Sequence, residues 1–193
     1  MPAPAASRFA RIVARIVSIV LHPFAVFTAL ALIAAARLDP DSLPRTMLGI
    51  GVAVAIVWAF VLQRHRSGRW STVDASQRQE RPLLYLLALV MAAAYWCWMG
   101  GTASATSQGV LAAVAMLCVA GVANRWIKLS LHMASLAFAG VALLSLWMPA
   151  AVALLALLPL LAWSRLRLAR HSRVEVLGGT ALGLISGLGL LLL

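Results

Sequence analysis

Long apolar stretches separated by short basic clusters limit this chain to a few kinds of fold. Hydrophobic residues make up 63% of the 193 residues, and the mean hydropathy is +0.96. Soluble domains contain only about 45–50% apolar residues. Sixteen Lys and Arg residues stand against five acidic ones, which gives a net charge of +11. Because the basic residues lie between apolar stretches, the pattern indicates an integral membrane protein and argues against nucleic-acid binding.

The apolar stretches predict an all-α fold, a polytopic transmembrane bundle with six to seven spans. A hydrocarbon core of about 30 Å needs about 20 helical residues at a rise of 1.5 Å per residue. The predicted spans are residues 17–36, 47–63, 83–99, 108–123, 131–147, 150–163 and 174–193. The alanines that end the first span resemble a signal-peptide cleavage site, but that apolar stretch exceeds the roughly 7–15 residues of a signal core. We therefore expect the first span to be retained.

The distribution of basic residues orients this bundle. Fourteen of the sixteen lie on the same side as the N-terminus, and only Arg37 and Arg45 lie on the other. The positive-inside rule predicts that the side with more basic residues is cytoplasmic. Arginines that serve to bind a ligand would also be counted on this side, although their position would not be set by the membrane topology.

Three polar clusters fall on the predicted cytoplasmic side, at residues 74–81, 128–132 and 165–175. A bundle that brings them together would form a cationic pocket at the level of the lipid headgroups. Arginine binds phosphate oxygens in a bidentate manner and lysine supplies a point charge, so a lipid phosphate is the expected ligand. Within the third cluster, His171 and Glu175 are four residues apart. On one helical face, the carboxylate would fix the imidazole tautomer and raise its basicity.

The third cluster also carries the residues of a known signature. Ser164-Arg165, five residues, His171 and then Glu175 resemble the third signature of the type 2 phosphatidic acid phosphatase superfamily, which shares its site with vanadium haloperoxidases. That signature usually ends in aspartate. The resemblance covers roughly residues 74–193, and it implies a phosphatase-type core in the C-terminal two thirds, with residues 1–70 forming N-terminal spans and a basic loop.

The two earlier clusters resemble the other two signatures of this family. The segment from Lys128 to His132, with Ser130 at its centre, is similar to the Lys-x-Ser-x-His form of the second signature in some bacterial membrane members. Leu129 and Leu131 replace the usual proline and glycine. Arg81-Pro82 resembles the end of the first signature, and Asp74 stands where that signature has lysine.

The resemblance implies a role for each matching residue. His171 would attack phosphorus to give a phosphohistidine, Glu175 would orient it, and His132 would protonate the leaving oxygen and later activate water. Asp74 would position an arginine. Neither a metal nor a cofactor is implied. The residues implied to bind the phosphate are Arg78, Arg81, Lys128, Ser130 and Arg165.

The predicted function is therefore that of a lipid phosphatase in a bacterial inner membrane, acting on a polyprenyl phosphate or diphosphate. Phosphatidate and phosphatidylglycerol phosphate are alternative substrates. A non-catalytic relative that binds or moves a phosphorylated lipid is the alternative of another class, and a channel or proton-coupled carrier is a weaker one. The expected partners are the lipid substrate and the bilayer.

The remaining residues of interest have ordinary interpretations. His22 and His65 have no partner at useful spacing, so no role is assigned to them, and Cys97 and Cys118 are interpreted as packing residues. Three glycines at four-residue spacing indicate close helix packing, either within the bundle or in a homodimer. They are Gly179, Gly183 and Gly187.

Overall fold

The computed structural model describes residues 5–69, 81–104 and 106–192, and within these residues every regular element is a helix. The described residues form two compact units, one of residues 5–27 with 127–192 and the other of residues 28–69, 81–104 and 106–126. The predicted all-α fold is therefore confirmed. The boundary expected at residues 70 and 71 refers to the phosphatase resemblance and remains a prediction.

The α-helices are α1 (Ala5–Val20), α2 (Pro23–Leu38), α3 (Leu43–Arg66), α4 (Arg81–Trp98), α5 (Ser107–Ala123), α6 (Leu131–Ala142), α7 (Met148–Ala156), α8 (Leu158–Arg167) and α9 (Arg173–Leu191), with short 3₁₀ turns η1 (Pro40–Ser42) and η3 (Gly101–Ala103).

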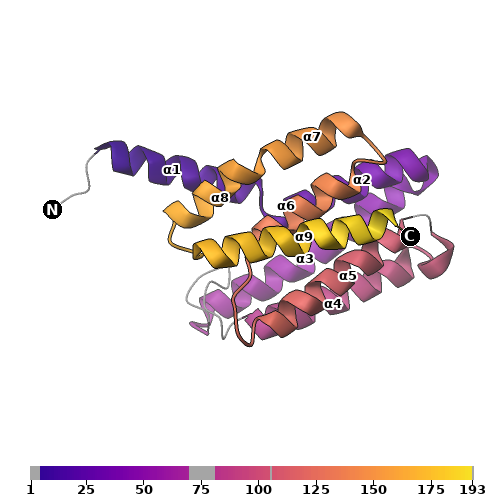
Figure 1. Ribbon diagram of the computed structural model, residues 1–193. Coiled ribbons are helices and arrows are strands. Elements are labelled where there is room, and N and C mark those ends of the chain that lie inside the picture. The colour runs from indigo at the N-terminus through magenta and orange to yellow at the C-terminus, as the bar shows by residue number, and fades with distance from the viewer. Residues whose placement is uncertain (1–4, 70–80, 105, 193) are drawn as a thin grey trace. The chain divides into compact units, whose positions relative to one another are not determined.

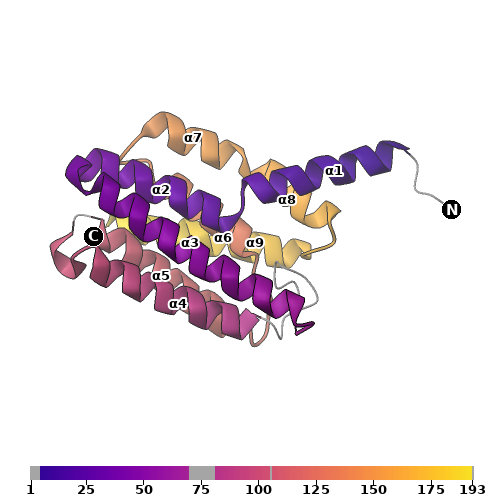
Figure 2. The same cartoon turned by 180° about the vertical axis from the view of Figure 1, so that it is seen from behind.

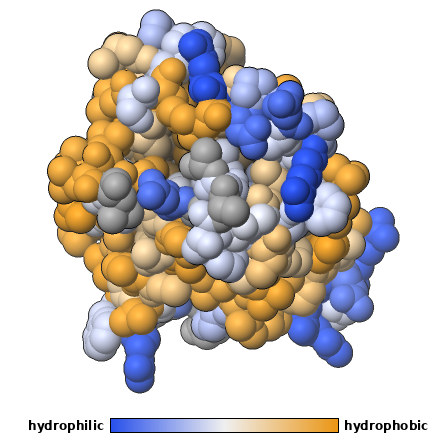
Figure 3. All heavy atoms as spheres, turned by 90° about the vertical axis from the view of Figure 1, so that its right-hand side faces the viewer, coloured by the Kyte–Doolittle hydropathy of each residue, from blue (hydrophilic) through white to orange (hydrophobic). Residues whose placement is uncertain are grey.

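The structure contains fewer candidate membrane spans than the sequence predicts. Among the described residues, three helical segments are long and apolar enough to cross a membrane, namely Pro40–Arg66, Met148–Arg167 and Arg173–Leu191. A fourth is added if two consecutive helices, Arg8–Val20 and Pro23–Leu38, count as one span bent by 41°. The face drawn in Figure 3 carries many orange, hydrophobic atoms between blue, hydrophilic ones, as expected for a chain with several such helices.

Helix α6 forms the core of the first unit. Almost all of its residues are buried, including Phe138, which is 0% exposed. It packs most extensively against α9, and Figure 1 shows the two helices side by side. At only 12 residues, α6 has the length of a buried core helix rather than of a helix that spans the bilayer alone.

The glycine stripe of α9 makes this packing possible. A Cβ atom at Gly183 would collide with the carbonyl oxygen of Ala134 and lie 2.8 Å from the Cβ of Ala137. Gly179 meets the backbone of Ser130 in the same way, and Gly187 meets Val141. The interpretation of the stripe as packing within the bundle is therefore confirmed, since α6 occupies this face.

Gly183→Ala is expected to lower the melting temperature of the detergent-purified protein, because its methyl group meets backbone rather than a movable side chain. Such overpacking costs about 1–3 kcal/mol. Gly189→Ala is the matched control, because nothing lies within 4 Å of its added Cβ and alanine favours the helix. Equal melting temperatures for the two variants would contradict this packing.

In the second unit, the end of α4 contacts the beginning of α3. The indole Nε1 of Trp98 donates a hydrogen bond to the carbonyl oxygen of Arg45 at 3.2 Å. Gly49 leaves room for this ring, since a Cβ there would lie 2.9 Å from Trp98 Cδ1. The chain then turns at Gly100 and Gly101, whose φ angles of 97° and 58° suit glycine.

The predicted first span is wrong as an uninterrupted helix. The helical conformation is interrupted at Leu21 and His22, between α1 and α2. Pro23 has no N–H to donate to the carbonyl of Ile19, so the helical hydrogen-bond ladder cannot continue. The N–H of His22 instead bonds to Ile19 O at 3.2 Å.

Candidate functional site

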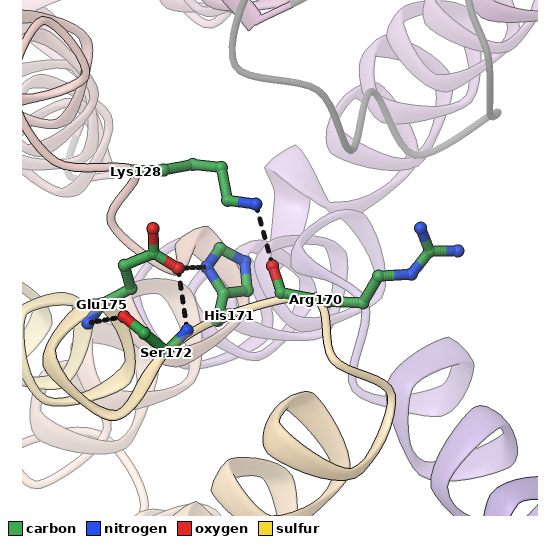
Figure 4. A network of polar contacts seen from close by, with 5 residues as sticks. All are labelled: Lys128, Arg170, His171, Ser172 and Glu175. Atoms are coloured by element: carbon green, nitrogen blue, oxygen red, sulfur yellow. Dashed lines mark hydrogen bonds and ion pairs between the residues drawn. The ribbon is translucent and has the colours of Figure 1, made fainter.

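The loop between α8 and α9 holds the predicted histidine–carboxylate pair. His171 Nδ1 lies 3.1 Å from Glu175 Oε2, as Figure 4 shows. A carboxylate can only accept a hydrogen bond, so Nδ1 carries the proton and Nε2 of the neutral ring keeps its lone pair. The side chain of His171 is only 1% exposed. The contact expected from the spacing is thus present, and its catalytic role stays a prediction.

Glu175 also caps α9, which the sequence analysis missed. Ser172 is the N-cap residue; its N–H donates to Glu175 Oε2 at 2.9 Å, and its Oγ accepts from the Glu175 N–H at 3.3 Å. This reciprocal pair is a capping box, and the Ser-x-x-Glu pattern was its signal in the sequence. One carboxylate oxygen therefore orients the histidine and starts the helix.

Glu175→Gln and Ser172→Ala separate these two roles. The glutamine keeps one acceptor oxygen but loses the charge that orients His171, so we expect the lipid-phosphate hydrolysis predicted from the sequence to fall by about 10- to 100-fold. Ser172→Ala removes only the cap and is expected to cost about 1 kcal/mol of stability with activity retained. Phosphate release and thermal unfolding, measured on both variants, check this. Loss of activity in proportion to loss of stability would assign Glu175 a structural role alone.

The loop between α8 and α9 begins with a residue in the left-handed conformation at the end of α8. Ala169 has a φ of 52°, its N–H bonds to Leu166 O at 3.0 Å, and the Arg170 N–H bonds to Arg165 O at 3.1 Å. This is the Schellman pattern, in which glycine normally occupies the left-handed position. An alanine there costs about 1–2 kcal/mol. The chain reverses at this turn and places His171 directly before α9.

The second cluster contacts this loop at two points. Lys128 Nζ donates to the carbonyl oxygen of Arg170 at 2.9 Å (Figure 4), and the Ser130 N–H donates to the Glu175 carbonyl at 3.0 Å. The second and third clusters of the sequence are therefore adjacent in this unit. In this arrangement Lys128 holds the loop that carries His171.

Ser130 presents a buried hydroxyl at the start of α6. The residue is 0% exposed and occupies the N-cap position, yet its side chain makes no capping hydrogen bond. Within the described part of the chain, Ser130 Oγ has no hydrogen-bond partner. The N–H groups of the first helical turn lack partners within α6, and such helix starts favour anions. An unsatisfied buried hydroxyl costs about 1–3 kcal/mol, which a ligand acceptor would relieve.

Ser164 and Arg165, on α8, form hydrogen bonds with residues of α1. Ser164 Oγ donates to the carbonyl oxygen of Ala14 at 2.7 Å, and Arg165 Nη1 donates to Ser18 Oγ. Both α8 residues are buried. Figure 2 shows α1 and α8 alongside each other, in agreement with their direct contacts. The N-terminal helix therefore belongs to the surroundings of the site.

His132 lies among charged and polar groups from three parts of this unit. Arg165 and His171 are close enough to act on it electrostatically, and the backbone of Ser18 lies beside its ring. The ring of His22 meets the His132 ring edge-on, with centroids 5.1 Å apart. The sequence analysis assigned no role to His22, and the structure places its ring against that of His132. An ionisable residue inside an apolar stretch was the available signal.

The first cluster is not placed by the structure. Asp74 and Arg78 lie outside the described residues, and Arg81 opens α4 but its side chain is not described. The described residues that come together in the first unit are Lys128, Ser130, His132, Arg165, His171 and Glu175. They combine two imidazoles, a carboxylate, a hydroxyl and two cations, which are groups that can act in nucleophilic and acid–base chemistry at an anion.

Comparisons with protein-family models, with curated proteins and with solved structures found no match for this chain.

Proposed function

We propose that this chain is an integral membrane lipid phosphatase that hydrolyses a phosphomonoester or diphosphate of a lipid through a phosphohistidine. The observation that carries the proposal is the His171–Glu175 pair, whose 3.1 Å contact leaves Nε2 of the neutral ring as a nucleophile. The proximity of His132 and Arg165 supports it further. The resemblance at Ser164-Arg165, His171 and Glu175 points to the same chemistry.

The first half of the reaction would form a covalent intermediate. Nε2 of His171 attacks phosphorus, the bond between phosphorus and the leaving oxygen breaks, and His132 gives its proton to that oxygen. Arg165, the Ser130 hydroxyl and the N–H groups at the start of α6 would stabilise the negative charge on the transferring phosphoryl group. Lys128, Arg78 and Arg81 are the other proposed cations of the site.

In the second half, water would release the phosphate. Neutral His132 takes a proton from the water, whose oxygen attacks phosphorus, and the P–N bond to His171 breaks. The electron pair returns to Nε2 and inorganic phosphate leaves. His132 ends protonated and His171 neutral, so both residues are ready for another substrate.

We further propose a bacterial inner-membrane location, with six to seven spans and the site on the cytoplasmic side. The count of fourteen basic residues on that side supports this orientation. A polyprenyl phosphate or diphosphate is the preferred substrate, and phosphatidate and phosphatidylglycerol phosphate are the alternatives. The apolar surface suits a substrate that stays in the bilayer.

A non-catalytic role in binding or moving a phosphorylated lipid is the second candidate. The burial of His171, with a side chain only 1% exposed, favours it, because a nucleophile must reach phosphorus. Lys128 also donates to the Arg170 carbonyl rather than pointing freely toward a ligand site.

Phosphate release by the detergent-purified protein separates these candidates. The panel contains undecaprenyl diphosphate, farnesyl diphosphate, phosphatidate and phosphatidylglycerol phosphate, each with and without a metal chelator. The proposal expects release from at least one lipid that resists the chelator. If a folded, monodisperse preparation binds these lipids but releases no phosphate from any of them, the enzyme proposal is wrong and the binding role is favoured.

A further inference from the structure

The break between α1 and α2 changes the hydrogen bonding of one carbonyl group. In an unbroken helix, Ser18 C=O would accept from the N–H of His22, four residues later. Here the His22 N–H bonds to Ile19 O at 3.2 Å, because Pro23 offers Ile19 no donor. The backbone of Ser18 lies beside the ring of His132. The helix break thus leaves the Ser18 carbonyl without the His22 N–H and next to the His132 side chain.

The same break orients His22. Its Nδ1 accepts a hydrogen bond from the Phe24 N–H at 3.3 Å, in the manner of a side chain that caps the start of a helix. A nitrogen that accepts from a backbone N–H carries no proton, so the ring is neutral with its proton on Nε2. Phe24 also packs against this ring, with centroids 5.2 Å apart. His22 is therefore held by α2 in one orientation.

His22 in turn bounds one side of His132. Their ring planes meet at 85° with centroids 5.1 Å apart, an edge-to-face arrangement. The other groups that act on His132 are Arg165 from α8 and His171 from the loop before α9. The Ser18 backbone and the His22 ring therefore both border the His132 ring.

We propose that His22 is a positioning residue for His132. This inference rests on the proposed function, in which His132 moves the proton of the leaving oxygen and of water. A hydrogen bond from one ring nitrogen to the neighbouring Ser18 backbone would leave the second nitrogen as the proton-transfer atom, and the His22 ring would prevent the imidazole from turning that nitrogen away. The N-terminal segment is then part of the catalytic arrangement, although it carries none of the resembling signatures.

The kinetic test uses His22→Asn, because asparagine keeps an acceptor for the Phe24 N–H and removes the ring that contacts His132. We expect kcat with farnesyl diphosphate to fall by about tenfold with KM changed by less than about twofold, and the pH–rate profile to shift. The matched control is His65→Asn, at an exposed histidine of α3 in the other unit, which should leave kcat unchanged. Equal kcat and pH profile for wild type and His22→Asn would overturn the proposal.

A second readout does not depend on activity. The chain has four histidines, so ¹⁵N-labelling of the imidazoles gives few ring signals, which single substitutions assign. At a pH where the His132 ring is neutral, we expect one tautomer for it in the wild type and a mixture in His22→Asn. If the wild type hydrolyses no lipid, the proposed function fails, whereas an unchanged His132 signal in the variant contradicts the positioning role alone. Both outcomes are readable from the same preparations.

Discussion

Replacement of His171 by alanine is expected to reduce the proposed lipid-phosphate hydrolysis by about 10³-fold or more, since removal of the proposed covalent nucleophile leaves only binding and charge stabilisation. The chemical reason is the pairing of Nδ1 with Glu175 Oε2, which presents Nε2 as the attacking atom. No neighbouring group with the same pairing is placed to replace it in the described part of the site. Phosphate release under saturating substrate measures the effect.

Two controls make the His171 result specific. His65→Ala removes an exposed histidine of the other unit and should leave hydrolysis unchanged. The thermal unfolding of His171→Ala should stay close to that of the wild type, because the capping hydrogen bonds between Ser172 and Glu175 remain. Residual hydrolysis within about tenfold of wild type, in a folded variant, would exclude His171 as the nucleophile.

Replacement of His132 by alanine is expected to reduce hydrolysis by about 10²- to 10⁴-fold, the usual contribution of a positioned acid–base group. The effect should depend on the leaving group. Phosphatidate must release an alkoxide, which needs the proton of His132, whereas farnesyl diphosphate releases a phosphate that is a better leaving group. The variant should therefore lose more activity with phosphatidate.

Single-turnover kinetics with the two lipids check this dependence. For farnesyl diphosphate, His132→Ala should form the phosphohistidine and then hydrolyse it slowly, because water activation is also lost. For phosphatidate, formation itself should be slow. If the rate of phosphohistidine formation falls equally for both lipids, His132 acts in binding or structure. An acid that protonates the leaving oxygen must slow phosphatidate, the substrate with the poorer leaving group, more than farnesyl diphosphate.

Local spacing predicted the parts of the site that are close in sequence. The i,i+4 relation of His171 and Glu175 and the glycine stripe of α9 both depend on the helical period alone, and both contacts are present. The all-α class followed from composition and apolar stretches. The capping box at Ser172 was equally local and was missed because Glu175 had already been given another role.

Contacts between distant segments could not be predicted in this way. Ser18 and His22 lie more than 100 residues before Arg165 and His132 in the chain, and no periodic pattern relates them. Hydropathy also cannot distinguish a helix that faces lipid from one that is buried in protein. The segment of residues 131–147 was predicted as a span from its hydropathy alone, and the burial of α6 within protein could not be predicted from it.

Detection of the covalent intermediate tests the central claim most directly. The protein is mixed with [³²P]farnesyl diphosphate, quenched in alkali and analysed for labelled peptide. We predict an alkali-stable, acid-labile phosphohistidine at His171, more abundant in His132→Ala than in the wild type and absent in His171→Ala. A preparation that releases phosphate at the wild-type rate without labelling His171 under any quench condition would contradict this account.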